Sequence, residues 1–159
     1  MVKLYYSFIK KQQKQNFVKH VLSIFGETLS EIKEDNFKQG ENYYSVSFSG
    51  DIIMVAVSNE KSVLSLERVE NVNYQLEAKN FCTEKEISKI SRIEGYYVLL
   101  TKKQSMAKYF NAKLKDVTFE DEIKLQGEIV KVKSTSGLFD EYIFSIASNE
   151  ENYEKILIM

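Results

Sequence analysis

The chain has 159 residues, of which 43% are hydrophobic and 13% aromatic, and its formal net charge is −1. This length suits one domain of ordinary size, and the composition is rich enough in apolar side chains to bury a core. It therefore excludes an intrinsically disordered chain. The near-neutral charge argues against a dedicated nucleic-acid binder, which carries a strong basic excess.

The chain contains one cysteine and one histidine. These counts exclude an internal disulfide and a zinc site built from a cysteine or histidine cluster. The longest apolar runs, such as Ile52–Val57, are too short to span a membrane, and the N-terminus has no signal-peptide pattern. We therefore expect a cytoplasmic protein.

The N-terminal part of the chain predicts a strand and then a helix. Val2–Ile9 is typical of a short strand, and Gln12–Phe25 has apolar side chains at helical spacing, with Gly26 just past its end. Thr28–Lys38 is polar and acidic and favours a short helix followed by a loop to Gly40. The first twenty residues hold five lysines and no acid. This basic segment is either a solvated helix face or a docking patch for a phosphate or an acidic partner.

Three strands are expected in the middle of the chain. Tyr43–Ser49 alternates between two faces, which is typical of a strand. Ile52–Ser58 is almost continuously apolar and predicts a buried central strand, and Ser62–Arg68 predicts a third strand. Ser49-Gly50-Asp51 provides a turn between the first two.

Helices are expected after these strands. Thr83-Glu84-Lys85-Glu86 is a capping box, in which the hydroxyl and the carboxylate each accept from the other residue's backbone N–H. It begins a helix that runs to about Glu94, where Gly95 is expected to end it. Tyr96–Phe110 then predicts a second helix.

The C-terminal part predicts strands near Glu128–Lys133 and Glu141–Ala147, separated by Ser134-Thr-Ser-Gly137, and a last strand at Ile156–Met159. Strands and helices do not alternate in the βαβ manner. We therefore predict an α+β protein rather than a doubly wound fold. No internal repeat is visible in the sequence.

Four stretches, taken in order, carry a family resemblance. They are Ser45-Val-Ser-Phe-Ser-Gly-Asp51, Val63-Leu-Ser-Leu-Glu67, Glu77-Ala-Lys-Asn-Phe-Cys-Thr-Glu-Lys-Glu86 and Leu99-Leu-Thr-Lys-Lys-Gln-Ser-Met-Ala-Lys108. They resemble Asn-Ile-Ser-His-Ser-Gly, Gly-Ile-Asp-Ile-Glu, Ala-x-Arg-Phe-Phe-x-x-x-Glu and Leu-Trp-Thr-x-Lys-Glu-Ala-x-x-Lys. These are motifs of the 4′-phosphopantetheinyl transferases of the two-repeat, surfactin-synthetase-activating type. The resemblance covers roughly Tyr43 to Ala147.

The resemblance implies a single domain over residues 1–159, with an antiparallel sheet packed against a long helix. Residues 1–42 would be a trimmed first repeat, and residues 43–159 the repeat that bears the motifs. A symmetric homo-oligomer that supplies the missing wall is the alternative to trimming. The tail Tyr142-Ile-Phe-Ser-Ile-Ala147 is similar to the closing strand of the family.

The resemblance also implies a reaction. Members of the family transfer 4′-phosphopantetheine from coenzyme A to a serine of an acyl or peptidyl carrier protein. Mg²⁺ lies between the pyrophosphate of coenzyme A and protein carboxylates, where it neutralises charge as the serine hydroxyl attacks.

The metal positions of the family correspond to Ser65, Glu67 and Gln104, so one carboxylate stands where the family has three. Ser65 replaces an Asp, and Gln104 replaces a Glu that is both a metal ligand and a possible general base. An amide cannot act as that base. Acidic residues that could replace the lost ligands are Asp51, Glu70 and Glu94.

The coenzyme A positions correspond to Ser47 and Phe48 in the first motif and to Lys103 and Lys108 in the helix motif. Phe48 stands where the family has a His. Lys103 and Lys108 would face the phosphates of coenzyme A and the attacked centre, and Lys103 and Gln104 occupy the catalytic positions.

Three functions follow as alternatives. The first is a divergent member with a degraded Mg²⁺ site and weak or no transferase activity, which binds coenzyme A, a carrier protein or another biosynthetic subunit. The second is a working transferase with a rebuilt metal shell. The third is an unrelated α+β binding or interaction module. We expect neither a nucleic acid nor a membrane as partner.

Overall fold

The structure is a computed structural model that describes residues 1–150 and 152–158. Five strands form the first sheet in the order β11-β1-β4-β3-β2. Their bounds are Val2–Phe8 (β1), Asn36–Gln39 (β2), Asn42–Ser49 (β3), Ile52–Ser58 (β4) and Tyr153–Leu157 (β11). The pairs are antiparallel except that β11 runs parallel to β1.

A second, antiparallel sheet has the order β5-β10-β9 and a small third sheet the order β6-β7-β8. Their strands are Ser62–Arg68 (β5), Val117–Phe119 (β6), Ile123–Leu125 (β7), Glu128–Ile129 (β8), Lys133–Phe139 (β9) and Tyr142–Ser148 (β10). The α-helices are Lys14–Ile24 (α1), Tyr74–Ala78 (α2), Glu84–Ser88 (α3) and Ile93–Tyr109 (α4), and short 3₁₀ turns are Lys11–Gln13 and Leu114–Asp116.

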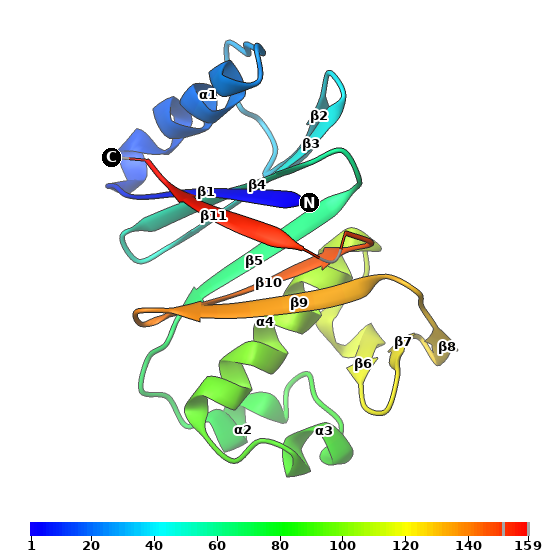
Figure 1. The fold of residues 1–159 in the computed structure, drawn as a ribbon. Helices are drawn as coiled ribbons and strands as arrows, with labels where there is room; N and C mark the ends of the chain where they lie inside the picture. Colours follow the sequence, from blue (N-terminus) through cyan, green and yellow to red (C-terminus); the bar gives the residue numbers. More distant parts are fainter. Residues whose placement is uncertain (151, 159) are drawn as a thin grey trace.

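The two larger sheets pack face to face, with α1 on the outside of the first and α4 on the outside of the second (Figure 1). The buried strand β4 shows why. Ile53, Val55 and Val57 pack with α1, and the alternate residues Ile52 and Met54 pack with β5 and β10. Because both faces of β4 are covered, all its residues are buried, as the continuous apolar run predicts.

The two large sheets share a three-stranded arrangement, although the first sheet has five strands in all. The first half of the chain contains β1, α1, β3 and β4 in this order, and the second half contains β5, α4, β9 and β10, with further short elements between them. In each sheet the last of these strands is central and pairs antiparallel with the other two. The chain is thus built from two β-α-β-β units, a repeat that the sequence does not reveal.

The first unit spans residues 2–58 and contains all four elements, although it is shorter than the second unit at residues 62–148. The second unit gains length from α2 and α3 before its long helix and from the strands β6 to β8 after it. The expected boundary between the repeats, after residue 42, falls within β3 and so inside the first sheet. In the structure the first unit ends with β4 and the second begins with β5.

Serine hydroxyls join β3 to β5 where the two units meet. Side chains of β3 at every second position accept hydrogen bonds from backbone N–H groups of β5. The pairs are Ser45 with Leu64 at 2.8 Å, Ser47 with Leu66 at 3.2 Å and Ser49 with Arg68 at 3.0 Å. Because β5 is the edge of its own sheet, these hydroxyls satisfy amides that the sheet leaves unpaired. We call this set the hydroxyl ladder.

The predicted α+β class, the antiparallel sheets and the long helix are confirmed. The predicted helix within Thr28–Lys38 is wrong, because the segment is an irregular loop that leads into β2. The side chain of Gln15 on α1 bonds both the N–H and the C=O of Ile32 at 2.9 Å. These tertiary bonds satisfy the backbone of the segment without a helical turn.

Two further boundaries differ from the predictions. Gly95 does not end a helix: α3 ends at Ser88, and Gly95 lies in the first turn of α4, where a glycine costs little. Ser134–Gly137 is not a connection but part of β9, because the hairpin turns later, at Asp140, with a φ of 50°. The predicted last strand is β11, and Met159 lies outside the described residues.

None of the helices in the described part of the chain is long and apolar enough to cross a membrane.

The hydroxyl ladder predicts a graded loss of stability. Ser45 is fully buried, and its hydroxyl accepts from Leu64 and donates to Asn36. We expect Ser45→Ala to lower the free energy of unfolding by about 1–3 kcal/mol, because buried polar groups lose their partners. Ser49→Ala removes an exposed bond and should change it by less than about 0.5 kcal/mol. Urea unfolding measures both, and equal losses would contradict the ladder.

Candidate functional site

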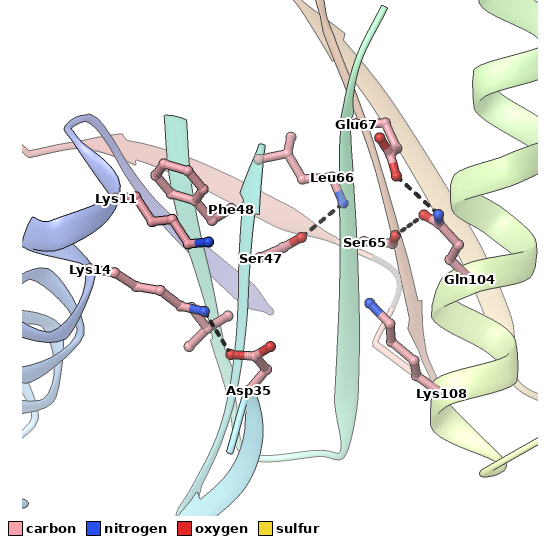
Figure 2. A pocket seen from close by; sticks show the side chains of 11 residues that line it. Lys11, Lys14, Asp35, Ser47, Phe48, Ser65, Leu66, Glu67, Gln104 and Lys108 are labelled. Carbon is pink, nitrogen blue, oxygen red and sulfur yellow. Dashed lines mark hydrogen bonds and ion pairs between the residues drawn. The ribbon is translucent and has the colours of Figure 1, made fainter. Parts of the chain in front are cut away.

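A pocket of about 380 Å³ opens beside the hydroxyl ladder, between the two units (Figure 2). Its walls come from β3, β5 and α4, and from the start of the first helical segment. The lining residues are Lys11, Lys14, Asp35, Val46, Ser47, Phe48, Ser65, Leu66, Glu67, Gln104 and Lys108. Six of the residues that the family motifs single out therefore lie in one pocket: Ser47, Phe48, Ser65, Glu67, Gln104 and Lys108.

Local structure explains how β5 and α4 present these groups. Residues of β5 alternate between two faces, so Leu66 packs between the sheets while Ser65 and Glu67 point toward α4 (Figure 2). Gln104 and Lys108 are four residues apart on α4 and share one side of the helix. The strand and the helix thus place three polar side chains and an ammonium group in one corner.

Ser65, Gln104 and Glu67 form a continuous hydrogen-bonded chain. The hydroxyl of Ser65 donates to Oε1 of Gln104, and Nε2 of Gln104 donates to Oε1 of Glu67 at 3.0 Å (Figure 2). A carboxylate can only accept, so the bond to Glu67 fixes the orientation of the amide. The residues at the three metal positions of the family therefore satisfy one another.

This donor set does not fit Mg²⁺. The ion requires a near-octahedral shell of oxygen ligands. Here Gln104 directs N–H, not oxygen, toward the single carboxylate of Glu67. The described residues contain no group of three or more His, Cys, Asp or Glu side chains that could hold a metal ion. We therefore derive no catalytic step through Mg²⁺.

The acidic residues considered as replacements do not line the pocket. Asp51 lies at the turn after β3 and accepts a hydrogen bond from the hydroxyl of Tyr142. Glu70 follows β5, and its backbone bonds the hydroxyl of Tyr97. Glu94 is half-buried in the first turn of α4. No second carboxylate from this set reaches Glu67.

Lys103 does not belong to the pocket. Its side chain is completely buried, its Nζ lies 2.8 Å from Oε1 of Glu86, and it donates to the carbonyl of Phe81 at 2.6 Å. Neighbouring residues of an α-helix point about 100° apart, so Lys103 and Gln104 cannot face the same way. The catalytic and coenzyme A roles expected of Lys103 are therefore not supported by its position, and we assign it a structural role.

Glu86 is also completely buried and joins three parts of the second unit. Besides the ion pair, its carboxylate accepts from the N–H of Thr83 at 2.8 Å and from the N–H of Phe119 at 2.7 Å. The first of these bonds belongs to the predicted capping box, which is confirmed. The ion pair thus ties α4 to the start of α3 and to β6.

Lysines surround the pocket. The ammonium groups of Lys11 and Lys108 point into it from opposite walls, and Lys14 pairs with Asp35 at 3.0 Å (Figure 2). Among the described residues neither Lys11 nor Lys108 has an ion-pair partner. Two positive charges are therefore free for an anion. The basic segment at the N-terminus signals Lys11 and Lys14, whereas nothing local in the sequence signals Asp35.

The cysteine and the histidine lie elsewhere. Cys82 is near the Lys103–Glu86 pair, and burial raises the pKa of its thiol to about 11. It is protonated at neutral pH and is a poor nucleophile. His20 is exposed on α1 and does not line the pocket.

The Lys103–Glu86 pair predicts a large stability effect. Lys103→Met should lower the free energy of unfolding by about 3–5 kcal/mol, because the carboxylate of Glu86 stays buried without its counter-charge. Lys108→Met, which changes an exposed residue on the same helix, should alter it by less than about 0.5 kcal/mol. Chemical denaturation compares the two variants. A loss at Lys103 no greater than at Lys108 would contradict the structural role.

Comparison of the sequence with protein-family models and with curated proteins finds no match. Two observations remain as the basis for a functional proposal: the motif resemblance within Tyr43–Ala147, and the pocket that gathers six of the motif residues. The motif residues are up to about sixty positions apart in sequence, so their meeting in one pocket does not follow from any one motif.

Proposed function

We propose that this chain is a divergent member of the 4′-phosphopantetheinyl transferase superfamily that binds coenzyme A or a carrier-protein partner and has weak or no transferase activity. The hydrogen-bonded chain of Ser65, Gln104 and Glu67 is the observation that carries this proposal. These three residues line the pocket, but only Glu67 is a carboxylate, whereas the family's reaction depends on three.

The architecture supports the family assignment. The family type that the motifs resemble has two repeats, and this chain has two β-α-β-β units with the pocket where they meet. Because the first unit is complete, one chain supplies both walls of the pocket. No second copy is then needed to form it, although a homo-oligomer stays compatible with the proposal.

The charges support a phosphate-bearing ligand. Lys11 and Lys108 present ammonium groups without ion-pair partners in the described structure, and a Lys ammonium binds phosphate as a compact point charge. Coenzyme A carries phosphate groups that these ammonium groups could bind. An acidic carrier protein, or another biosynthetic subunit, is a second partner that the same basic surface suits.

Transfer of the phosphopantetheine group makes demands that this pocket meets poorly. The attacking serine must lose a proton, and charge develops on the phosphate oxygens in the transition state. Gln104 cannot accept that proton, and Ser65 brings no charge with which to hold a cation. Binding energy remains available from the lysines, but the groups that act on the reacting atoms are missing.

The proposal predicts binding without transfer. We would mix the protein with coenzyme A, Mg²⁺ and an apo carrier protein and measure the intact mass of the carrier, beside an active family member as control. The carrier mass should stay unchanged. Calorimetry should detect coenzyme A binding, and Lys108→Ala should weaken it about tenfold or more, because a charge-assisted contact is lost. Lys115→Ala, an exposed lysine outside the pocket, should not.

Two results would contradict the proposal. A carrier that gains the phosphopantetheine mass at an ordinary enzymatic rate would favour the working transferase, and Glu67→Ala should then abolish the transfer. Absence of both transfer and binding of coenzyme A or carrier protein would favour an unrelated α+β binding module.

A further inference from the structure

A divalent ion between protein carboxylates and a phosphate does two things. It links the elements that carry its ligands, and it compensates the negative charge of the phosphate. In this pocket, protein groups can perform both tasks. The amide of Gln104 links the elements, and the unpaired ammonium groups of Lys11 and Lys108 can compensate the negative charge.

Gln104 links β5 to α4. Ser65, which is 2% exposed, donates to its carbonyl oxygen, and Glu67 accepts from its nitrogen at 3.0 Å. Turning the amide over would place Oε1 of Gln104 against the carboxylate of Glu67, where two acceptors would repel each other. A cation at this point would therefore meet N–H groups and would have to break both bonds.

The lysines can neutralise a phosphate directly. Lys14 forms an ion pair with Asp35, so Lys11 and Lys108, on opposite walls, are the lysines available to a ligand. Glu67 is held by Gln104 and adds a single negative charge to the lining. A pyrophosphate group placed between the two walls would accept charge-assisted hydrogen bonds from both lysines.

We infer that this pocket binds a phosphate- or pyrophosphate-bearing ligand without a divalent cation, with the amide of Gln104 in the structural place of the metal. The inference rests on the proposed function, since it concerns the ligand of the same pocket. It differs from that proposal in one point: there the ligand binds without being transferred, and here it also binds without a metal.

The test is calorimetry of the full chain with inorganic pyrophosphate and, separately, with coenzyme A, in EDTA and in excess MgCl₂. Affinities in EDTA should be within about threefold of those in MgCl₂, or tighter, because Mg²⁺ competes with the lysines for the phosphate. Lys11→Ala and Lys108→Ala should each weaken pyrophosphate binding about tenfold or more. Lys115→Ala should leave it unchanged.

A gain of metal binding provides a second readout. Gln104→Glu places a carboxylate beside Glu67, and two adjacent negative charges favour a bound cation. Electron paramagnetic resonance should show Mn²⁺ bound to this variant and not to the unaltered protein. Gln104→Ala is the control, since it removes the amide without adding charge. Circular dichroism checks that each variant is folded, and Lys11→Ala tests the lysines if Gln104→Glu is not.

The outcomes separate the two proposals. Coenzyme A binding that falls about tenfold or more in EDTA, or Mn²⁺ bound by the unaltered protein, would overturn metal-independent binding and leave binding without transfer intact. Coenzyme A binding without pyrophosphate binding would overturn recognition through the phosphates. Failure of coenzyme A to bind under either condition would overturn this inference and the coenzyme A part of the proposed function together.

Discussion

The hydroxyl ladder between β3 and β5 is the contact on which the pocket depends. Apolar side chains make most of the other contacts between the two sheets, and the hydroxyl of Tyr142 adds hydrogen bonds with Asp51. Ser45, Ser47 and Ser49 add directional bonds to the amides of β5 and so fix the register of one unit against the other. Since Ser47 and Leu66 also line the pocket, the bond that aligns the units also sets the pocket wall.

The second unit separates a buried ion pair from the polar and charged side chains that line the pocket. Lys103 and Glu86 lie in the interior, fully paired, and hold α4 against the neighbouring elements. One residue further along the helix, Gln104 faces the pocket and closes the chain with Ser65 and Glu67. The buried pair keeps α4 in position, and α4 in turn keeps Gln104 and Lys108 in the pocket. The proposed binding surface depends on this placement of Gln104 and Lys108.

Local patterns predict the strands of Tyr43–Arg68 because alternation, a continuous apolar run and a glycine turn are properties of adjacent residues. The non-helical course of Thr28–Lys38 depends on Gln15, and the strand at Ser134–Gly137 depends on pairing with β10. Both are tertiary effects that no local pattern contains. The two units resemble each other in the order and pairing of their strands and not in their residues, so the sequence does not reveal the repeat.

The same distinction holds for the pocket. Motif spacing identifies Ser65, Glu67 and Gln104, but not the bonds among them. Lys103 and Glu86 both stand out in the sequence, one in the helix motif and one in the capping box, yet only the fold pairs them. Asp35 has no local signal because it reaches the pocket through the course of a loop.

The most direct test of the account is a ¹H–¹⁵N correlation spectrum of the protein recorded during a titration with coenzyme A in EDTA. We expect the backbone signals of Lys11, Ser47, Glu67 and Lys108 to shift, together with the side-chain amide signals of Gln104. Signals of the buried pair around Lys103 should stay in place. A spectrum that is unchanged, or that changes only at residues away from the pocket and the hydroxyl ladder, would contradict metal-independent binding of coenzyme A in this pocket.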